Sequence, residues 1–139
     1  EELPARIGEL ENLRELYLFS NALTELPPEI GELENLRVLR VGNYDPGRVF
    51  EETVERFDLC RNRLAKLPRE IGKLKRLEEL DLRYNELREL RFELTELVEL
   101  KSLGVEGNPF SDERLSGEIE DDPRYLWYLF GLPAPSDPR

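Results

Sequence analysis

Residues 13–36 read LRELYLFSNALTELPPEIGELENL, and the spacing of the apolar residues in this stretch decides the fold. They recur neither every 3.6 residues, as in one amphipathic helix, nor every second residue, as in one strand. A shift of 23 residues brings leucines under leucines again, so that Leu13 corresponds to Leu36 and Leu77 to Leu100. The interval between Leu36 and Leu77 is one such period plus 18 extra residues. This period predicts a solenoid of stacked coils.

Each coil has two recognisable halves. The first half, L-x-x-L-x-L-x-x-N, occurs at 13–21, 77–85 and 100–108, and VERFDLCRN at 54–62 has the same skeleton with Val and Phe at leucine positions. The second half occurs as LPARIGELENL at 3–13, LPPEIGELENL at 26–36 and LPREIGKLKRL at 67–77. These motifs resemble the leucine-rich repeat family, in the LPxxIGxLxxL subclass found largely in intracellular proteins, over residues 3–110.

The resemblance implies an α/β fold class. We expect a solenoid of four to five coils with a short parallel sheet on its concave side, short helices or loops on its convex side and a helical C-terminal cap. The residues support this directly, because alternation at Leu16 and Leu18 places both side chains on one face of a strand. Prolines at 27 and 68 end the strand half and suit the first turn of a helix. Asparagine amides can bond to turn backbone, so we expect a buried ladder of Asn21, Asn62, Asn85 and Asn108.

Two domains are predicted, a solenoid at 1–110 with an irregular coil at 42–53 and a cap with a tail at 111–139. The first residues match only the second half of a coil, so we expect the sequence to be a piece of a longer protein. Tyr44 stands where the ladder asparagine belongs, and Asp45-Pro46-Gly47 is a turn signal. The irregular coil is either a packing variation or a loop that carries Tyr44, Arg48 and Phe50 over a binding surface.

The later part of the chain predicts three helices. Residues 91 and 95 lack the proline and glycine of earlier coils, so a longer regular helix is expected from about Phe92 to Glu99. Ser111-Asp112-Glu113 predicts the start of a short helix. Residues 123–131, PRYLWYLFG, predict another, which is either a cap over the last coil or an exposed anchor for a neighbouring domain.

The strand alternation also predicts which side chains face outward on the concave side. Aromatic residues among charged ones are typical of protein-binding sites, although Tyr17 and Phe19 are alternatively isolated surface residues or lie under a preceding region. The predicted partner-binding residues on this face are Glu15, Tyr17, Phe19, Val38, Arg40, Arg56, Asp58, Glu79, Asp81, Arg83 and Tyr84.

Composition excludes several classes of function. The net charge is −11, from 20 Lys and Arg against 31 Asp and Glu, which argues against nucleic acid and anionic membrane surfaces as partners. Arginines interleave Asp58, Glu79 and Asp81, and no nucleophile with a base partner is identifiable, so we predict no catalytic residues, no metal site and no cofactor. Cys60 is the single cysteine, which excludes an intramolecular disulfide and favours a reducing, cytoplasmic location.

The resemblance implies a non-enzymatic protein-interaction module, binding a protein or peptide through its concave face as part of a larger intracellular signalling or scaffold protein. Two alternatives stay open: a structural segment that self-associates through its open N-terminal coil, and a sensor of a peptide or small ligand.

Overall fold

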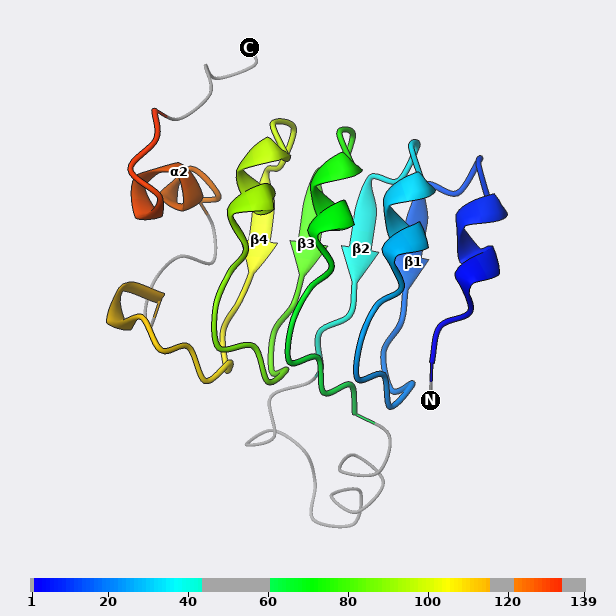
Figure 1. The fold of residues 1–139 in the computed structure, drawn as a ribbon, viewed down its shortest axis with the longest axis horizontal. Coiled ribbons are helices and arrows are strands. Elements are labelled where there is room, and N and C mark those ends of the chain that lie inside the picture. The colour runs from blue at the N-terminus through cyan, green and yellow to red at the C-terminus, as the bar shows by residue number, and fades with distance from the viewer. Residues whose placement is uncertain (1, 44–60, 116–121, 134–139) are drawn as a thin grey trace.

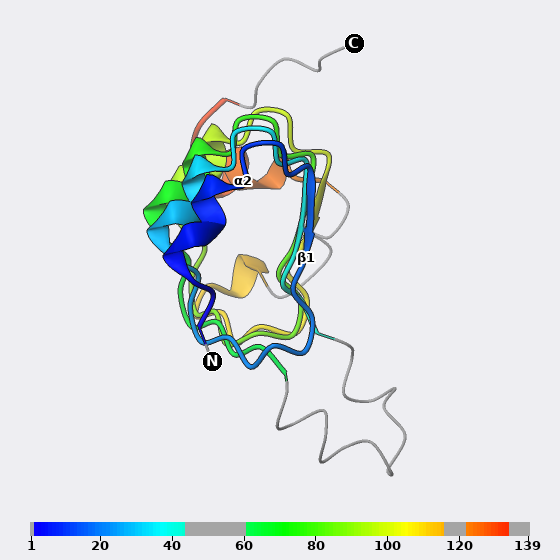
Figure 2. The ribbon, with the colours of Figure 1, turned by 90° about the vertical axis from the view of Figure 1, so that its right-hand side faces the viewer.

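The coils stack in chain order, each contributing a short strand and a short 3₁₀-helix. The computed structural model describes residues 2–43, 61–115 and 122–133. Strands β1 to β4 form one parallel sheet in the order β1-β2-β3-β4, and the 3₁₀-helices at residues 5–9, 28–32, 69–73 and 92–96 lie on the opposite wall (Figures 1 and 2). This arrangement confirms the predicted solenoid. The elements are η1 (Ala5–Glu9), β1 (Glu15–Tyr17), η2 (Pro28–Glu32), β2 (Val38–Arg40), η5 (Arg69–Lys73), β3 (Glu79–Asp81), η6 (Phe92–Glu96), β4 (Ser102–Gly104), η7 (Glu113–Leu115) and α2 (Tyr125–Leu129).

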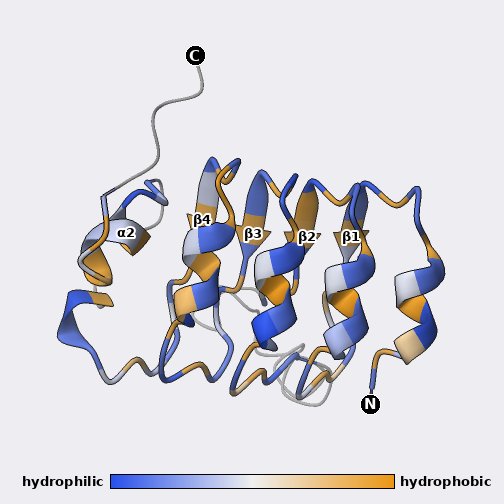
Figure 3. Ribbon diagram, turned by 45° about the horizontal axis from the view of Figure 1, so that its top comes forward, coloured by the Kyte–Doolittle hydropathy of each residue, from blue (hydrophilic) through white to orange (hydrophobic). Residues whose placement is uncertain are grey.

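The repeated leucines fill the space between the two walls. Leu39, Leu80 and Leu103 at the centres of their strands are fully buried, as are Ile30 and Ile71 in the helices. Figure 3 shows the hydrophobic residues of η2 and η5 flanked by hydrophilic ones, which are the residues that face solvent. One coil cannot bury these side chains alone, so the fold depends on stacking.

Three of the four predicted asparagines form the ladder, of which Asn62 and Asn85 are buried and Asn108 is half-buried. The Asn62 side chain accepts a hydrogen bond from the Leu23 backbone N–H at 3.0 Å and donates to the Leu18 carbonyl at 2.7 Å. Asn85 and Asn108 make the equivalent pairs of bonds, each to the coil that precedes its own. Asn21 lies in the first coil and is exposed, and its amide donates to the Phe19 carbonyl.

The repeat pattern predicts a further coil at residues 54–76, with a strand between those at 36–44 and 77–85, and this position in the sheet is wrong. β2 pairs directly with β3, with Leu39 opposite Leu80. Asn62 therefore completes the coil that begins at Leu36, because it bonds to the coil containing β1. The chain leaves this coil after Asn43, whose side-chain amide donates to the Asn62 carbonyl and whose side-chain oxygen accepts from the Asn62 N–H, both at 2.8 Å. Most of the predicted irregular coil lies outside the described residues.

The predicted long helix at 92–99 is also wrong. η6 spans Phe92–Glu96 and ends like its neighbours, with Leu97 at φ −82° and ψ 70°. Leu94 and Thr95 take the places of Ile71 and Gly72 in the stack, so the neighbouring coils override local helix propensity. The Thr95 hydroxyl satisfies its polar group by donating to the Phe92 carbonyl at 2.7 Å.

The predicted short helices after the repeats are confirmed as η7 and α2. Leu126 and Trp127 of α2 are buried against the last coil, and the Phe130 ring meets Phe92 edge-on at 5.5 Å. The cap interpretation of this segment is therefore correct. Among the described residues, no helix has the length and apolar character that crossing a bilayer requires.

Candidate functional site

The outward side chains of the four strands form two columns, which we call the sheet face. Strand register fixes the columns, because residues at paired positions lie side by side on neighbouring strands. One column contains Glu15, Val38, Glu79 and Ser102, and the other contains Tyr17, Arg40, Asp81 and Gly104.

An aromatic pair occupies the β1 end of the sheet face. The rings of Tyr17 and Phe19 lie 6.0 Å apart, and the Arg40 guanidinium lies 5.2 Å from the Tyr17 ring centre. Tyr17 and Phe19 are 45% and 38% exposed, which is unusual for large aromatic side chains on a sheet. The Tyr17 hydroxyl donates to Glu15 at 3.0 Å, and this bond raises the pKa of Tyr17 because it stabilises the protonated phenol. The pair therefore offers rigid apolar surface with an oriented polar tip.

Two ion pairs occupy the middle of the sheet face. Arg40 binds both carboxylate oxygens of Glu79, at 2.9 and 3.1 Å, and these hydrogen bonds raise the pKa of Arg40. Arg83 binds both oxygens of Asp81 in the same manner, at 3.0 and 3.1 Å. Two-point contacts of this kind restrict both side chains, so the charges sit at fixed positions. The result is the mixed-sign surface that the sequence predicts.

Glycines shape the surface around these ion pairs. A Cβ atom at Gly42 would collide with the Asp81 carboxylate, and one at Gly104 would lie 3.1 Å from Arg83 Cγ. The lack of a Cβ atom at both glycines leaves room for the side chains of Asp81 and Arg83 and a depression at the β3–β4 end of the face. The depression has a volume of about 260 Å³ and is lined by Arg40, Glu79, Leu80, Asp81, Arg83, Ser102 and Gly104.

The structure brings together nine of the predicted binding residues on the sheet face. They are Glu15, Tyr17, Phe19, Val38, Arg40, Glu79 and Asp81, with Arg83 and Tyr84 beside them. Arg83 and Tyr84 follow β3, and Tyr84 has φ 56°, a left-handed conformation that turns the chain away from the sheet. Because β2 pairs directly with β3, the predicted position of Arg56 and Asp58 between them is wrong. Arg56, Asp58, Tyr44, Arg48 and Phe50 lie outside the described residues.

The carboxylates of Glu79 and Asp81 on the sheet face are engaged in ion pairs. Both oxygens of Glu79 and both of Asp81 already accept hydrogen bonds from an arginine. Within residues 2–43, 61–115 and 122–133, no group of three or more His, Cys, Asp or Glu side chains has the arrangement of a metal site. What the face offers is exposed aromatic area beside oriented charges, which is the chemistry of a protein-binding hot spot.

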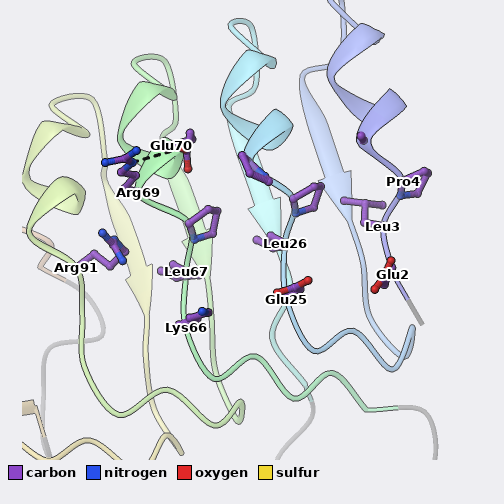
Figure 4. Close-up of a pocket in the computed structure, with 14 residues that line it drawn as sticks. Glu2, Leu3, Pro4, Glu25, Leu26, Lys66, Leu67, Arg69, Glu70 and Arg91 are labelled. Atoms are coloured by element: carbon purple, nitrogen blue, oxygen red, sulfur yellow. Dashed lines mark ion pairs between the residues drawn. The ribbon is translucent and has the colours of Figure 1, made fainter.

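A second surface was missed by reasoning from the sequence. The Leu-Pro segments that lead into successive 3₁₀-helices lie side by side and form a groove of about 640 Å³ (Figure 4). Its signal was available, because Pro4, Pro27 and Pro68 occupy one position of the repeat. The prediction that each proline ends a strand half does not indicate the surface that the prolines form together.

Comparisons with known proteins agree with this architecture. One family model, described as Leucine rich repeat, matches residues 52–110, and a second, described as Leucine Rich Repeat, matches residues 12–33. No match was found among the curated proteins.

Several solved structures resemble the chain. A chain of the PEPR1–AtPEP1 structure is 28% identical with a TM-score of 0.59, over 78% of this chain and 13% of that one. The Leptospira interrogans LRR protein LIC12759 is 34% identical with a TM-score of 0.47, over 78% of this chain and 29% of that one. The Arabidopsis thaliana receptor kinase GASSHO1/SCHENGEN3 ectodomain, solved in complex with CASPARIAN STRIP INTEGRITY FACTOR 2, is 29% identical with a TM-score of 0.48, over 78% and 14%. The chain thus spans less than a third of the length of each of these three proteins.

Proposed function

Because the chain belongs to the leucine-rich repeat family, we propose that it is a non-enzymatic recognition module that binds a protein or peptide through its sheet face. The observation that carries this proposal is the exposed Tyr17–Phe19 pair, held beside the Arg40–Glu79 ion pair. Aromatic and arginine side chains dominate binding energy at interfaces. Aromatic rings bury large areas with few rotatable bonds, and the planar guanidinium of arginine makes directed ionic contacts. Similarity to a chain of the PEPR1–AtPEP1 structure supports an interaction role.

The proposed mechanism follows from the layout of the face. A partner would cover the aromatic pair with apolar side chains and reach the fixed carboxylates and guanidinium groups at the interface rim. The ion pairs are already formed, so binding orders few additional side chains. The charges then select the partner by complementarity, while the aromatic pair supplies most of the affinity.

An affinity capture experiment tests this site. The wild-type chain is compared with Tyr17→Ala/Phe19→Ala/Arg40→Glu, and with Tyr128→Ala as a matched control, because Tyr128 is 68% exposed on the C-terminal cap. Circular dichroism verifies that all three baits are folded. We expect a specific partner to be retained by the wild type and the control and lost by the triple variant. Retention of the same partner by all three baits would exclude the sheet face as its site.

We further propose that the module acts in the cytoplasm as part of a larger signalling or scaffold protein. The support is the single cysteine, the absence of an N-x-Ser/Thr sequon and the subclass that the LPxxIGxLxxL motif resembles. Localisation of the tagged full-length protein tests this, and secretion or glycosylation would contradict it.

A specific observation favours self-association as a second candidate function. Leu10 is 50% exposed, whereas Leu33, Leu74 and Leu97 at the same repeat position are fully buried. β1 is also an edge strand, which can pair with another chain. Sedimentation of the wild type and of Leu10→Lys over a range of protein concentrations tests this candidate. A monomeric mass at every concentration for both proteins would exclude it.

A further inference from the structure

The Leu-Pro groove lies on the wall that carries the 3₁₀-helices, away from the outward side chains of the sheet (Figure 4). The proposed function of the sheet face therefore leaves it unused. Its floor comes from one repeated position: Pro4, Pro27 and Pro68 each precede a helix, and Arg91 takes this place in the next coil.

The backbone of the floor is extended in every coil. The φ and ψ angles are −67° and 147° at Pro4, −70° and 152° at Pro27, and −69° and 145° at Pro68. These values are those of polyproline II. Prolines carry no N–H, and the three proline carbonyls accept bonds from Ile7, Ile30 and Ile71 inside their own turns. The floor therefore offers stacked pyrrolidine rings, which favour apolar and ring contacts over new backbone hydrogen bonds.

Charges divide the groove along its length. Glu2 and Glu25 line the end nearest the N-terminus, and Lys66, Arg69 and Arg91 line the other end (Figure 4). Arg69 contacts Glu70, which also lines this end, and Arg91 is paired with Glu93, while Lys66 is exposed. A ligand with positive charge at one end and negative charge at the other would match this division.

The coil spacing sets the length of such a ligand. Neighbouring coils lie about 4.8 Å apart, so the three steps from the coil of Glu2 to the coil of Arg91 span about 14 Å. An extended or polyproline II peptide advances about 3.1–3.4 Å per residue. Opposite charges that reach both ends of the groove are therefore separated by about four residues.

We propose that this groove binds an extended peptide segment with a basic and an acidic residue about four positions apart and with proline or aromatic residues between them. The basic residue lies at the end of the groove lined by Glu2 and Glu25, and the acidic residue lies at the end lined by Lys66 and Arg91. The central rings pack on Pro27 and Pro68. Proline and aromatic rings are complementary surfaces, and an extended ligand rich in proline loses little conformational entropy on binding.

An NMR titration of the ¹⁵N-labelled full chain tests the proposal. The probe is acetyl-Arg-Pro-Phe-Pro-Glu-amide, and the reference peptide has glutamine at both charged positions. We expect the probe to shift the amide signals of Leu26 and Leu67, which directly follow Glu25 and Lys66 in the sequence. The signals of Leu39 and Leu80 in the sheet should stay unchanged. The charged probe should bind about two- to fivefold more tightly than the reference at low salt, in keeping with exposed ion pairs, and lose this advantage at high salt.

Charge-reversal variants locate the interaction. Glu25→Lys and Lys66→Glu should each weaken binding of the probe by about two- to fivefold. Glu34→Lys is the matched control, because Glu34 is exposed outside the groove, and it should have no effect. The proposal is overturned by equal affinity for the two peptides, by shifts confined to the sheet, by variants that bind the probe as the wild type does, or by no binding. None of these results would affect the capture experiment on the sheet face.

Discussion

Replacement of Asn62 by alanine should destabilise the solenoid far more than the same replacement of Asn21, although both residues occupy one position of the repeat. Asn62 is fully buried and joins two coils through its side chain. Asn21 is exposed, and its amide donates to the Phe19 carbonyl two residues earlier. The substitution is the same in both variants, so the difference between their free energies of unfolding isolates the contribution of the hydrogen bonds that Asn62 makes to the neighbouring coil.

The magnitude follows from the backbone groups that lose a partner. Alanine at position 62 leaves the Leu23 N–H and the Leu18 carbonyl without the bonds of 3.0 and 2.7 Å that Asn62 provides. The Val41 carbonyl keeps a bond from Asn85 at 3.1 Å. A buried backbone group without a partner costs about 1–3 kcal/mol, so the two groups together predict a loss of about 2–6 kcal/mol. Water can replace the bond of exposed Asn21, for which we expect a loss of about 0–1 kcal/mol.

Urea unfolding followed by circular dichroism measures both variants. With a urea dependence of about 2 kcal/mol per molar, Asn62→Ala should lower the midpoint by about 1–3 M and Asn21→Ala by at most about 0.5 M. Asn85→Ala is the matched positive control, because Asn85 bonds to Leu64 and Val41 in the same way. Equal shifts for Asn62→Ala and Asn21→Ala, together with a large shift for Asn85→Ala, would refute the assignment of Asn62 to the coil of β2.

Three further predictions use the same assay. Deletion of residues 44–61 joins Asn43 to Asn62 in a coil of the regular 23 residues. The variant should fold, and its free energy of unfolding should equal that of the wild type or exceed it by up to about 2 kcal/mol, because the entropy cost of closing the inserted segment is removed. An unfolded product would contradict this. Gly107→Ala should cost about 1–3 kcal/mol, because Gly107 has φ 74° and a Cβ atom would meet the Tyr84 ring. Ser20→Gly should be neutral or stabilising by about 0.5 kcal/mol, because exposed Ser20 has φ 55°. The reverse order of stabilities would show that left-handed strain does not matter at these positions. The hydrogen bonds from Arg91 lower the pKa of Glu93 below its ordinary 4.5. The stabilisation from these bonds is therefore complete above pH 4.5 and is lost as the pH falls through the lowered pKa. In Arg91→Ala the urea midpoint should decline less steeply with acid, and a pH profile identical to that of the wild type would exclude this pair as a contributor.

Much of the fold can be predicted from the sequence because every coil must satisfy its neighbours. The spacing of leucines identifies strands and turns, and Asn85 and Asn108 have the ladder contacts that the motif predicts. The number of coils could not be predicted in this way. VERFDLCRN has the skeleton of a strand half, but the pairing of Leu39 with Leu80 decides which strands are adjacent, and this pairing is a long-range fact.

Local propensity also failed where the stack imposes its own geometry. Residues 92–99 favour a regular helix, but a coil has room for only the five-residue 3₁₀-helix that its neighbours have. For the candidate site, alternation correctly places Tyr17, Arg40 and Asp81 in one column. Their two-point ion pairs could not be predicted, because rotamers and the glycine positions beneath them decide these contacts.

The asparagine ladder gives the array a direction. Each inner asparagine bonds to the coil before its own, so loss of the first coil would take the backbone groups that Asn62 satisfies away with it. Loss of the coil that contains Asn108 would instead leave the Leu87 N–H without its partner. Opening of the segment that contains Asn62 should therefore speed amide hydrogen exchange at Leu23, and opening of the segment that contains Asn108 should speed it at Leu87. Each of the coils of β1, β2 and β3 therefore depends on the coil that follows it for hydrogen bonds to its turn backbone.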